Sequence, residues 1–366
     1  MADHPEMADP PALNLDPTPT AEELDLLVTM VRHYSPSRHE QAVNRYLVEA
    51  MARLGFDAAL DRAGNAVGAL GTGPREIVLL GHSDTVRGEI PVRLEDGVLH
   101  GRGAVDAKGP LATFVAAAGR ARDALARQGK RVVVVGAVEE ECRTSKGAKY
   151  ALRRPEPEAC VIGEPSGWGA VTLGYKGRLL LHFTVRQPMH HGASGEPTAC
   201  EEALRLWRTV EEFARAYNEG KSQWEGLHAS LLQVTSRANG LSDQARLTIG
   251  FRFPPALGLE VVDDLVRKAG VVGEVRKEGA MEPVLASKAT PLVRAFLQAI
   301  RESGGGPKFK VKTGTSDMNL VARRWRCPLV AYGPGDSTLD HTPREHLSVD
   351  EYGRAIAVLA RALTLL

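Results

Sequence analysis

Apolar runs that end in a histidine or a carboxylate constrain the fold of this chain more than any other feature. Three such runs occur: residues 77–80 precede His82 and Asp84, residues 132–135 precede three glutamates, and residues 159–162 precede Glu164. Continuous apolar runs of this length are typical of strands buried on both faces of a parallel sheet. The carboxyl ends of parallel strands share one edge of an open α/β sheet, where ligands collect. We therefore expect these polar side chains to converge.

The converging side chains form a set that suits divalent metal ions. The candidate ligands are two imidazoles and three carboxylates: His82, Asp106, Glu140, Glu164 and His341. Such a mixed set favours zinc, although cobalt or manganese fits comparably. Asp84 lies two residues after His82, so in an extended strand it can hydrogen-bond one imidazole nitrogen while the other binds metal. With Glu139 left over as a general base, the set indicates a two-metal hydrolase.

Length and composition exclude several other classes of protein. At 366 residues the chain can bury a sizeable core in two domains, and a net charge of +1 argues against general nucleic-acid binding. No apolar run is long enough to cross a membrane, and the N-terminus lacks a signal peptide's basic and apolar regions. Residues 1–19, rich in Pro and Asp, are expected to be a disordered tail. The four scattered cysteines fit free thiols in a reducing cytoplasm.

The order of predicted elements gives the domain organisation. Thr20 is expected to begin a helix with a capping box to Glu23. Strands at 75–80, 131–138, 159–162 and 170–175 then alternate with helices at 39–54, 108–128 and 145–153, which predicts a mainly parallel sheet between helices. The glycine-rich run at 68–73 is expected to be a loop. This α/β pattern resumes after residue 285, with helices at 289–303, from Ser316 and after Ser348, and strands at 309–311 and 329–332.

Between these two parts the order of predicted strands and helices changes. Strands at 179–186, 227–237, 244–253 and 271–278 alternate with helices at 198–217 and 260–268, in the order βαββαβ. That order predicts a split-βαβ, ferredoxin-like α+β domain inserted into the first. We therefore expect a metal-binding catalytic domain over residues 20–177 and 285–366, and a lid or dimerisation domain over 178–284.

The motifs of the first part resemble those of the co-catalytic zinc metallopeptidases, a family that includes aminoacylase, acetylornithine deacetylase, succinyl-diaminopimelate desuccinylase and the glutamate carboxypeptidases. The resemblance covers nearly the whole chain. It implies that His82 binds one metal and is oriented by Asp84, that Asp106 bridges both metals, and that the Asp106–Ala107 peptide is cis. It also implies that Glu164 and His341 complete the two sites.

The glutamates after residue 138 leave one assignment open. In the family the first member of a Glu pair is the base and the second is a ligand, which favours Glu139 as base and Glu140 as ligand. The residue before that pair is commonly Asp, and here it is Val138. Since three glutamates follow in succession, the register can also shift, which makes Glu140 the base and Glu141 the ligand.

The inserted part also carries residues that resemble the family's substrate contacts. His191, with His190 as its rival, matches a histidine that reaches the active site of a neighbouring subunit and polarises the scissile carbonyl. The resemblance therefore implies a homodimer joined through the lid. Asn239 and Arg252 match positions that hold the substrate carboxylate, and Thr315 and Ser316 match a loop that lines the substrate.

Within the family, the motifs around Asp106 and Glu139 look most like those of enzymes that release lysine, and in some cases ornithine, from an amino-group carrier protein. The resemblance implies the last step of lysine biosynthesis through α-aminoadipate, with an acidic carrier as partner. We expect this chain to bind the carrier through one of two basic clusters: Lys308, Lys310 and Lys312, or Arg323, Arg324 and Arg326. Acetylornithine, succinyl-diaminopimelate and dipeptides remain alternative substrates, and a metal-free carrier- or peptide-binding protein remains the alternative of another class.

Overall fold

The computed structural model describes residues 13–366, which divide into two units. The first unit contains the residues up to 173 together with 286–310 and 321–366, and the second contains 174–285 and 311–320. The unit boundaries lie close to the predicted ones, except that residues 311–320 belong to the second unit. Residues 1–12 of the predicted tail lie outside the described residues. The rest of that tail is held to the first unit, because the carbonyls of Asp16 and Thr18 accept hydrogen bonds from Arg120.

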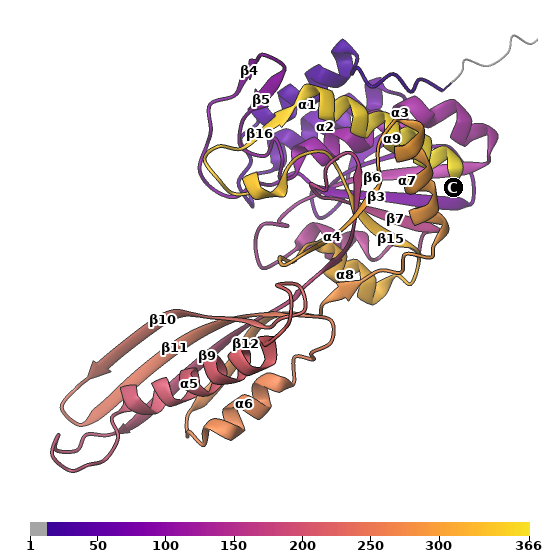
Figure 1. Cartoon of the computed structure of the whole chain (residues 1–366). Coiled ribbons are helices and arrows are strands. Elements are labelled where there is room, and N and C mark those ends of the chain that lie inside the picture. Colours follow the sequence, from indigo (N-terminus) through magenta and orange to yellow (C-terminus); the bar gives the residue numbers. More distant parts are fainter. Residues whose placement is uncertain (1–12) are drawn as a thin grey trace, which may run out of the picture. The chain divides into compact units, whose positions relative to one another are not determined.

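A mainly parallel sheet forms the centre of the first unit (Figure 1). Its residues 174–175, 284–285 and 311–312 are counted with the second unit. Within residues 13–366 its nine strands run in the order β1-β2-β6-β3-β7-β15-β8-β13, with β14 also paired to β8. The strands are β1 Asp57–Leu60, β2 Ala66–Leu70, β3 Arg75–His82, β6 Lys130–Ala137, β7 Ala159–Gly163, β8 Ala170–Tyr175, β13 Val284–Leu285, β14 Lys308–Lys312 and β15 Leu329–Tyr332. The central pairs β6–β3, β3–β7 and β7–β15 are parallel, which confirms the predicted α/β class.

Helices cover this sheet because their apolar faces match its buried strands. The helices are α1 Ala21–Arg32, α2 Gln41–Arg53, α3 Lys108–Arg127, α4 Lys146–Ala151, α7 Pro291–Glu302, α8 Asp317–Arg324 and α9 Val349–Leu365, with a 3-10 turn at Ser337–Leu339. The predicted capping box is confirmed: Thr20 accepts from the Glu23 backbone N–H, and Glu23 accepts from that of Thr20. Helix α9 packs against both α3 and α7 beside the sheet (Figure 1).

Several short strands were not predicted. Strand β2 ends with residues 68–70, where the sequence was expected to form a loop. Gly68 lies there because helix α2 closes onto the strand: an added Cβ would lie 2.5 Å from the sulfur of Met51. A second small sheet, ordered β16-β5-β4, joins β4 Arg93–Glu95, β5 Val98–His100 and β16 His346–Ser348. In this small sheet β16, which follows His341 in the sequence, pairs with β5, which precedes Asp106.

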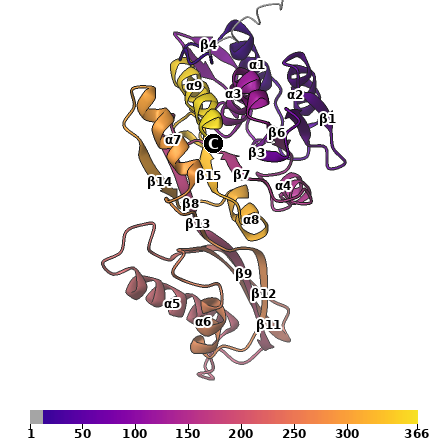
Figure 2. The ribbon, with the colours of Figure 1, turned by 90° about the vertical axis from the view of Figure 1, so that its right-hand side faces the viewer.

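The second unit has the predicted βαββαβ order. Its elements are β9 Gly177–Pro188, α5 Ala199–Asn218, β10 His228–Ala238, β11 Ser242–Phe253, α6 Val261–Ala269 and β12 Glu274–Met281, and the antiparallel sheet is ordered β10-β11-β9-β12. Both helices lie on one face of this sheet (Figure 2). Alternate residues of β9 and β11, such as Phe183 and Leu247, form the core with them. The other face of the sheet carries no helix of this unit.

Two further features bear on the predictions from composition. All four cysteines are free thiols. Among the described residues, none of the helices has both the length and the apolar character that a membrane span requires.

A buried ion pair links two helices of the first unit and generates a prediction about stability. The guanidinium of Arg120 in α3 lies 2.6 Å from the carboxylate of Glu23 in α1, with side-chain exposures of 5% and 9%. Arg120→Ala leaves that carboxylate buried and unpaired, so we expect the free energy of unfolding to fall by about 3–5 kcal/mol in urea denaturation. Arg122→Ala, which removes an exposed arginine of the same helix, should cost about 0–1 kcal/mol. Equal effects of the two substitutions would contradict this account.

Candidate metal centre

Strand pairing brings the predicted ligands to one edge of the main sheet. His82 is the last residue of β3 and is paired with Ala137, the last residue of β6. Gly81 is paired with Gly163, so Glu164 follows β7 directly beside His82. The glutamates begin two residues after Ala137. The carboxyl ends of three adjacent parallel strands therefore supply the candidate side chains, as the sequence predicts.

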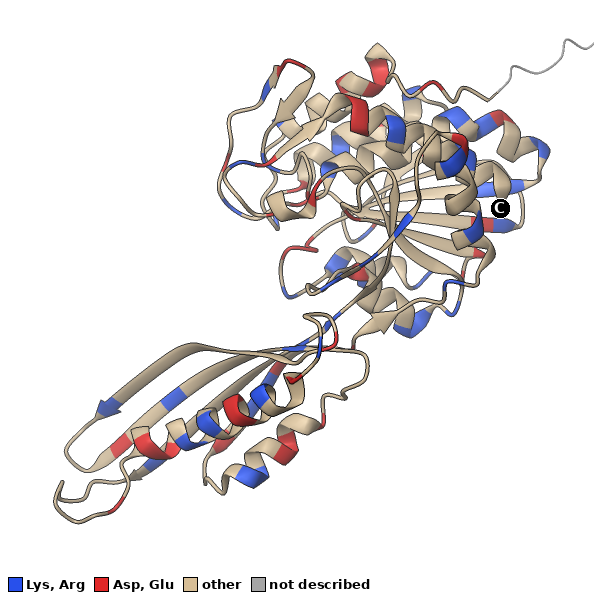
Figure 3. Cartoon of the chain, viewed as in Figure 1, with Lys and Arg blue, Asp and Glu red and all other residues tan. Residues whose placement is uncertain are grey.

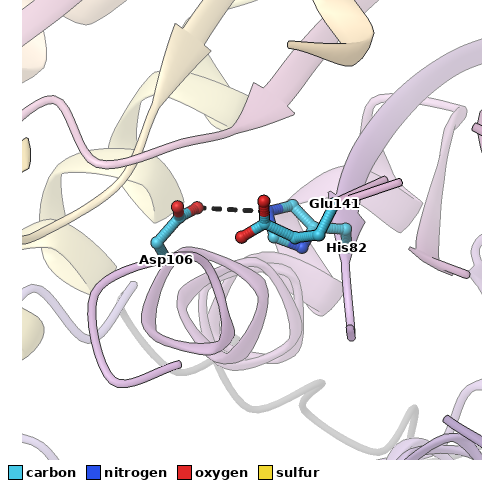
Figure 4. Close-up of side chains that lie close together, drawn as sticks. All are labelled: His82, Asp106 and Glu141. Carbon is cyan, nitrogen blue, oxygen red and sulfur yellow. Dashed lines mark hydrogen bonds and ion pairs between the residues drawn. The ribbon is translucent and has the colours of Figure 1, made fainter. Parts of the chain in front are cut away.

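Four side chains of this edge are in contact, and Asp106 is at their centre. Its Oδ1 lies 3.2 Å from Nε2 of His82, and its Oδ2 lies 3.0 Å from Nε2 of His341. The same nitrogen of His341 lies 3.0 Å from Oε1 of Glu141. Figure 4 shows the group formed by His82, Asp106 and Glu141, whose ligand atoms all lie within 4.8 Å of one another. Asp106 thus directs one oxygen to each imidazole.

The structure brings the third glutamate of the run, Glu141, into this group. Glu139 has a φ of 61°, and its carboxylate accepts a hydrogen bond from Thr144 and lies 3.9 Å from Nζ of Lys146. The carboxylate of Glu139 is therefore engaged away from the imidazoles. The preferred register, with Glu139 as base and Glu140 as ligand, disagrees with this geometry. The geometry favours the alternative register, in which Glu141 is the ligand and Glu140 the base.

The carboxylate of Asp84 positions this turn. Its Oδ1 and Oδ2 accept hydrogen bonds from the backbone N–H groups of Glu140 and Glu141, both at 3.0 Å. Asp84 is fully buried, and its backbone carbonyl lies 3.0 Å from Nδ1 of His82. When Nδ1 donates to this carbonyl, Nε2 is left facing Asp106. Asp84 thus contacts His82 most closely through its backbone carbonyl, whereas the prediction used its carboxylate, whose Oδ1 lies 3.5 Å from the same nitrogen. The carboxylate also fixes the backbone that carries the two glutamates.

The sequence analysis did not identify Glu345, which positions Asp106. Oε1 of Glu345 accepts hydrogen bonds from the backbone N–H groups of Gly103, Val105 and Asp106, at 2.9, 3.0 and 3.0 Å. Oε2 of Glu345 pairs with Arg102 at 2.8 Å, and both side chains are buried. Pairing between β16 and β5 places Glu345 beside this loop. Arg102 and Glu345 are more than 240 residues apart, and no motif spacing relates them.

The electrostatic environment of these side chains favours positively charged groups. Burial alone lowers the pKa of His82, but its hydrogen bonds with Asp106 and Asp84 outweigh burial and raise that pKa well above its usual value. Hydrogen bonds with Asp106 and Glu141 raise the pKa of His341 to about 10. Burial, together with repulsion from Asp106, raises the pKa of Glu141 to about 7. The site thus stabilises positive charge, and its imidazole and carboxylate donors fit a divalent metal of the zinc type.

Two further predictions for the first unit concern the position of Glu164 and the peptide bond between Asp106 and Ala107. Glu164 is 7% exposed at the end of β7, although it is not among the three residues grouped within 4.8 Å. The Asp106–Ala107 peptide is cis, in agreement with the resemblance.

The predicted substrate residues lie in the second unit. His190 is half-buried, with Nε2 3.3 Å from the Pro197 carbonyl and Nδ1 3.2 Å from the Ser194 hydroxyl. His191 is exposed, and its Nδ1 accepts a hydrogen bond from the backbone N–H of Ala193. A nitrogen that accepts is unprotonated, so the neutral ring of His191 carries its proton on Nε2. His191 therefore presents an N–H donor to solvent.

Of the remaining predicted residues, Arg252 and Asn239 lie near opposite ends of strand β11. Arg252 donates to the hydroxyl of Thr315 at 3.2 Å, whereas Asn239 lies in the turn before the strand begins. At the usual rise of an antiparallel strand, the two are separated by roughly 30 Å, so they cannot hold one carboxylate within a single chain. Ser316 is buried, and its hydroxyl accepts a hydrogen bond from the backbone N–H of Met318 at the start of helix α8.

The position of Glu345 predicts a loss of metal affinity when it is removed. Glu345→Ala leaves three backbone N–H groups and Arg102 without their acceptor and frees the loop that carries Asp106. Loss of such supporting contacts typically lowers metal affinity about 10–100-fold. Titration of zinc against a competing chelator measures this, with Arg344→Ala, which removes the adjacent exposed side chain, as the control. Unchanged affinity in Glu345→Ala would show that Asp106 is positioned without it.

Comparisons with known proteins place this site in a family. A family model described as peptidase family M20/M25/M40 matches residues 78–365. A LysW-lysine hydrolase of Deinococcus radiodurans is 47% identical over 358 residues, which are 96% of this chain and 99% of the relative. A putative LysW-lysine/LysW-ornithine hydrolase of Thermococcus kodakarensis is 39% identical over 92% of this chain and 90% of its own length.

Solved structures of low sequence identity share the fold. An M20 family metallo-carboxypeptidase of Sulfolobus solfataricus aligns with a TM-score of 0.73 at 19% identity, over 94% of this chain and 99% of its own. Aminopeptidase PepT of Bacillus cereus aligns with a TM-score of 0.76 at 17% identity, over 95% and 99%. The resemblance drawn from the motifs is confirmed, and the chain belongs to peptidase family M20/M25/M40.

Proposed function

We propose that this chain hydrolyses the amide bond between lysine and the terminal glutamate side chain of an amino-group carrier protein and so releases lysine. An ornithine conjugate of a carrier would be its second substrate and would release ornithine. The main support is the 47% identity, over nearly the full length of both chains, to a relative named LysW-lysine hydrolase. Relatives named for both lysine and ornithine conjugates support the broader product range. This reaction would be the last step of lysine biosynthesis through α-aminoadipate, and its ornithine counterpart would serve arginine biosynthesis.

The metal centre that we propose for this reaction uses the second register of the glutamates. His82, Asp106, Glu141, Glu164 and His341 would hold two divalent ions, with Asp106 between them. Zinc suits the donor set best, although cobalt and manganese remain options. Bound there, the ions would lower the pKa of water and polarise the scissile carbonyl.

The proposed proton transfer is assigned to Glu140. Its backbone N–H is held by Asp84, and its charge contributes to the raised pKa of His82, which indicates that it lies near the imidazole. Glu140 would take a proton from the attacking water and pass it to the leaving amine. The C–N bond breaks as the new C–O bond forms, so the products are the carrier's carboxylate and the amino group of lysine. Glu139, bonded to Thr144, would take no part.

We also propose a homodimer in which the lid supplies His191 to the site of the neighbouring subunit. The exposed Nε2–H of His191 suits a donor to the carbonyl oxygen as negative charge develops there. His190 is a weaker candidate because both of its ring nitrogens already lie within hydrogen-bonding distance of neighbours. Arg252, near the end of strand β11, would bind the substrate together with its hydrogen-bond partner Thr315.

The proposed partner is an acidic carrier, and exposed basic side chains support this. Lys308 and Lys310 of β14 and Arg323 and Arg324 of α8 are exposed, as is Arg326 after that helix. Charge complementarity of this kind mainly increases the association rate and falls with salt. The four free thiols support a reducing, cytoplasmic location.

The proposed substrate can be tested by direct comparison. We expect release of free lysine from the carrier–lysine conjugate at a kcat/KM at least about tenfold above that for acetylornithine, succinyl-diaminopimelate or a dipeptide. Amino-acid analysis of the products measures this. KM for the conjugate should rise with ionic strength, whereas that for acetylornithine should not. Faster turnover of acetylornithine than of the conjugate would overturn the assignment.

Single substitutions distinguish the two registers of the glutamates. Glu140→Gln should lower kcat by about 10²–10⁴-fold and retain its metal, because only proton transfer is removed. Glu141→Gln should lose bound metal. Glu139→Gln should keep both metal content and most activity, and elemental analysis with steady-state kinetics separates the three outcomes. An inactive Glu139→Gln enzyme with full metal content would restore the first register.

Subunit mixing tests the role of His191 across the dimer. Glu140→Gln and His191→Ala homodimers should each be nearly inactive, whereas mixed dimers contain one site with an intact Glu140 and an intact His191. We therefore expect activity to return after subunit exchange, which tagged subunits and native mass spectrometry can verify. His190→Ala serves as the control and should remain active. No recovery in verified mixed dimers would place His191 in its own subunit's site or outside the mechanism.

A further inference from the structure

The sheet of the second unit carries a polar cavity around the buried side chain of Gln244. It has a volume of about 440 Å³ and is lined by Arg186, Arg237, Asn239, Ser242 and Gln244. Three of these residues form one row across three strands: Arg237 of β10 is paired with Gln244 of β11, which is paired with Arg186 of β9. Directly paired residues point to the same face of a sheet, so the two guanidinium groups flank the amide of Gln244. Figure 3 shows basic residues on strands β10 and β11.

Gln244 is unusual because it is buried on the face that carries no helix of its unit. Its exposure is 4%, and its Oε1 accepts a hydrogen bond from Nε of Arg237 at 2.8 Å. An arginine nitrogen can only donate, so the oxygen of the amide must face Arg237. The Nε2 of Gln244 is then a buried donor, and no protein atom among the described residues accepts from it. Burying a donor without a partner is costly, and such a group calls for an explanation.

The side-chain amide of Asn239 also has its oxygen engaged and its nitrogen left as a donor. Oδ1 of Asn239 accepts from the backbone N–H groups of Leu241 and Ser242 and from the Ser242 hydroxyl. Because backbone N–H groups donate, the amide nitrogen of Asn239 must point elsewhere. No carboxylate among residues 13–366 forms an ion pair with Arg186 or Arg237. The two side-chain amide oxygens of the cavity are thus satisfied internally, while two positive charges and two amide N–H₂ groups remain.

We propose that this cavity binds a carboxylate group of an acidic peptide, with Arg186 and Arg237 on either side of it and Nε2 of Gln244 as the central donor. Arginine guanidinium groups suit carboxylates because their planar donors match both oxygens. A ligand that presented only a neutral amide group would leave the charges of the two guanidinium groups uncompensated. The carboxylate can belong to an acidic side chain or to a chain terminus, since both present the same oxygens.

The full-length, metal-loaded protein labelled with 15N-arginine allows a test that reads the cavity directly. The Nε–H signals of Arg186 and Arg237, assigned through single substitutions, are followed during titration with three capped tripeptides. The first has only glutamine side chains and an amidated end, the second has glutamate side chains and an amidated end, and the third has glutamine side chains and a free terminal carboxylate. We expect saturable shifts with the second or the third peptide, which identifies the source of the carboxylate, and none with the neutral peptide.

Variants separate a specific cavity from diffuse attraction. Arg186→Gln and Arg237→Gln should each weaken binding about tenfold or more, as monitored through the remaining arginine. Arg246→Gln is the matched control, because Arg246 is exposed on the same face of β11 but does not line the cavity. It should change affinity less than about twofold. Equal weakening by Arg246→Gln, equal shifts with the neutral peptide, or no saturable binding would overturn the proposal.

Gln244→Glu provides a second test that does not depend on removing an arginine. Its carboxylate would lie between the two guanidinium groups and take the place of the bound one. We therefore expect this variant to fold with an unchanged or raised melting temperature and to lose peptide binding. A Gln244→Glu protein that still binds the acidic peptide with the affinity of the unsubstituted chain would show that the ligand lies elsewhere.

Discussion

The contact between the Asp106 carboxylate and two imidazoles is the interaction on which the site depends. Asp106 is almost fully buried, so its negative charge is stable only beside positive charge or hydrogen-bond donors. Its two oxygens meet His82 from the end of β3 and His341 from far along the chain. Hydrogen bonds from His341 and His82 outweigh the effect of burial and lower the pKa of Asp106. Glu141 joins this group through its contact with His341.

Two further carboxylates hold the loops that carry the ligands. Asp84 accepts the backbone N–H groups of Glu140 and Glu141, while Glu345 accepts those of the loop before Asp106. These bonds span 56 to 57 residues for Asp84 and about 240 for Glu345. The site therefore forms only when strands β3 and β6 and the small sheet are all in place. Affinity for metal and integrity of the fold are coupled for this reason.

Much of the fold could be predicted because its signals are local. Continuous apolar runs gave the central parallel strands, and alternation gave the second unit, since both patterns follow from which faces are buried. The register of the glutamates could not be predicted, because three identical side chains follow one another. In the folded chain Glu139 has a positive φ, and the carboxylate of Glu141 lies 3.0 Å from Nε2 of His341. Glu345 and the buried amide of Gln244 depend on partners distant in the sequence or on a neighbouring strand, and no local pattern marks them.

The central claim is that these side chains form a centre for divalent metals. The most direct measurement is elemental analysis of the active protein, purified without chelator, with kcat followed as metal is removed and restored. The account predicts about two ions per chain, activity lost with the metal, and recovery on adding zinc, cobalt or manganese. A preparation with no bound metal and full activity would contradict it.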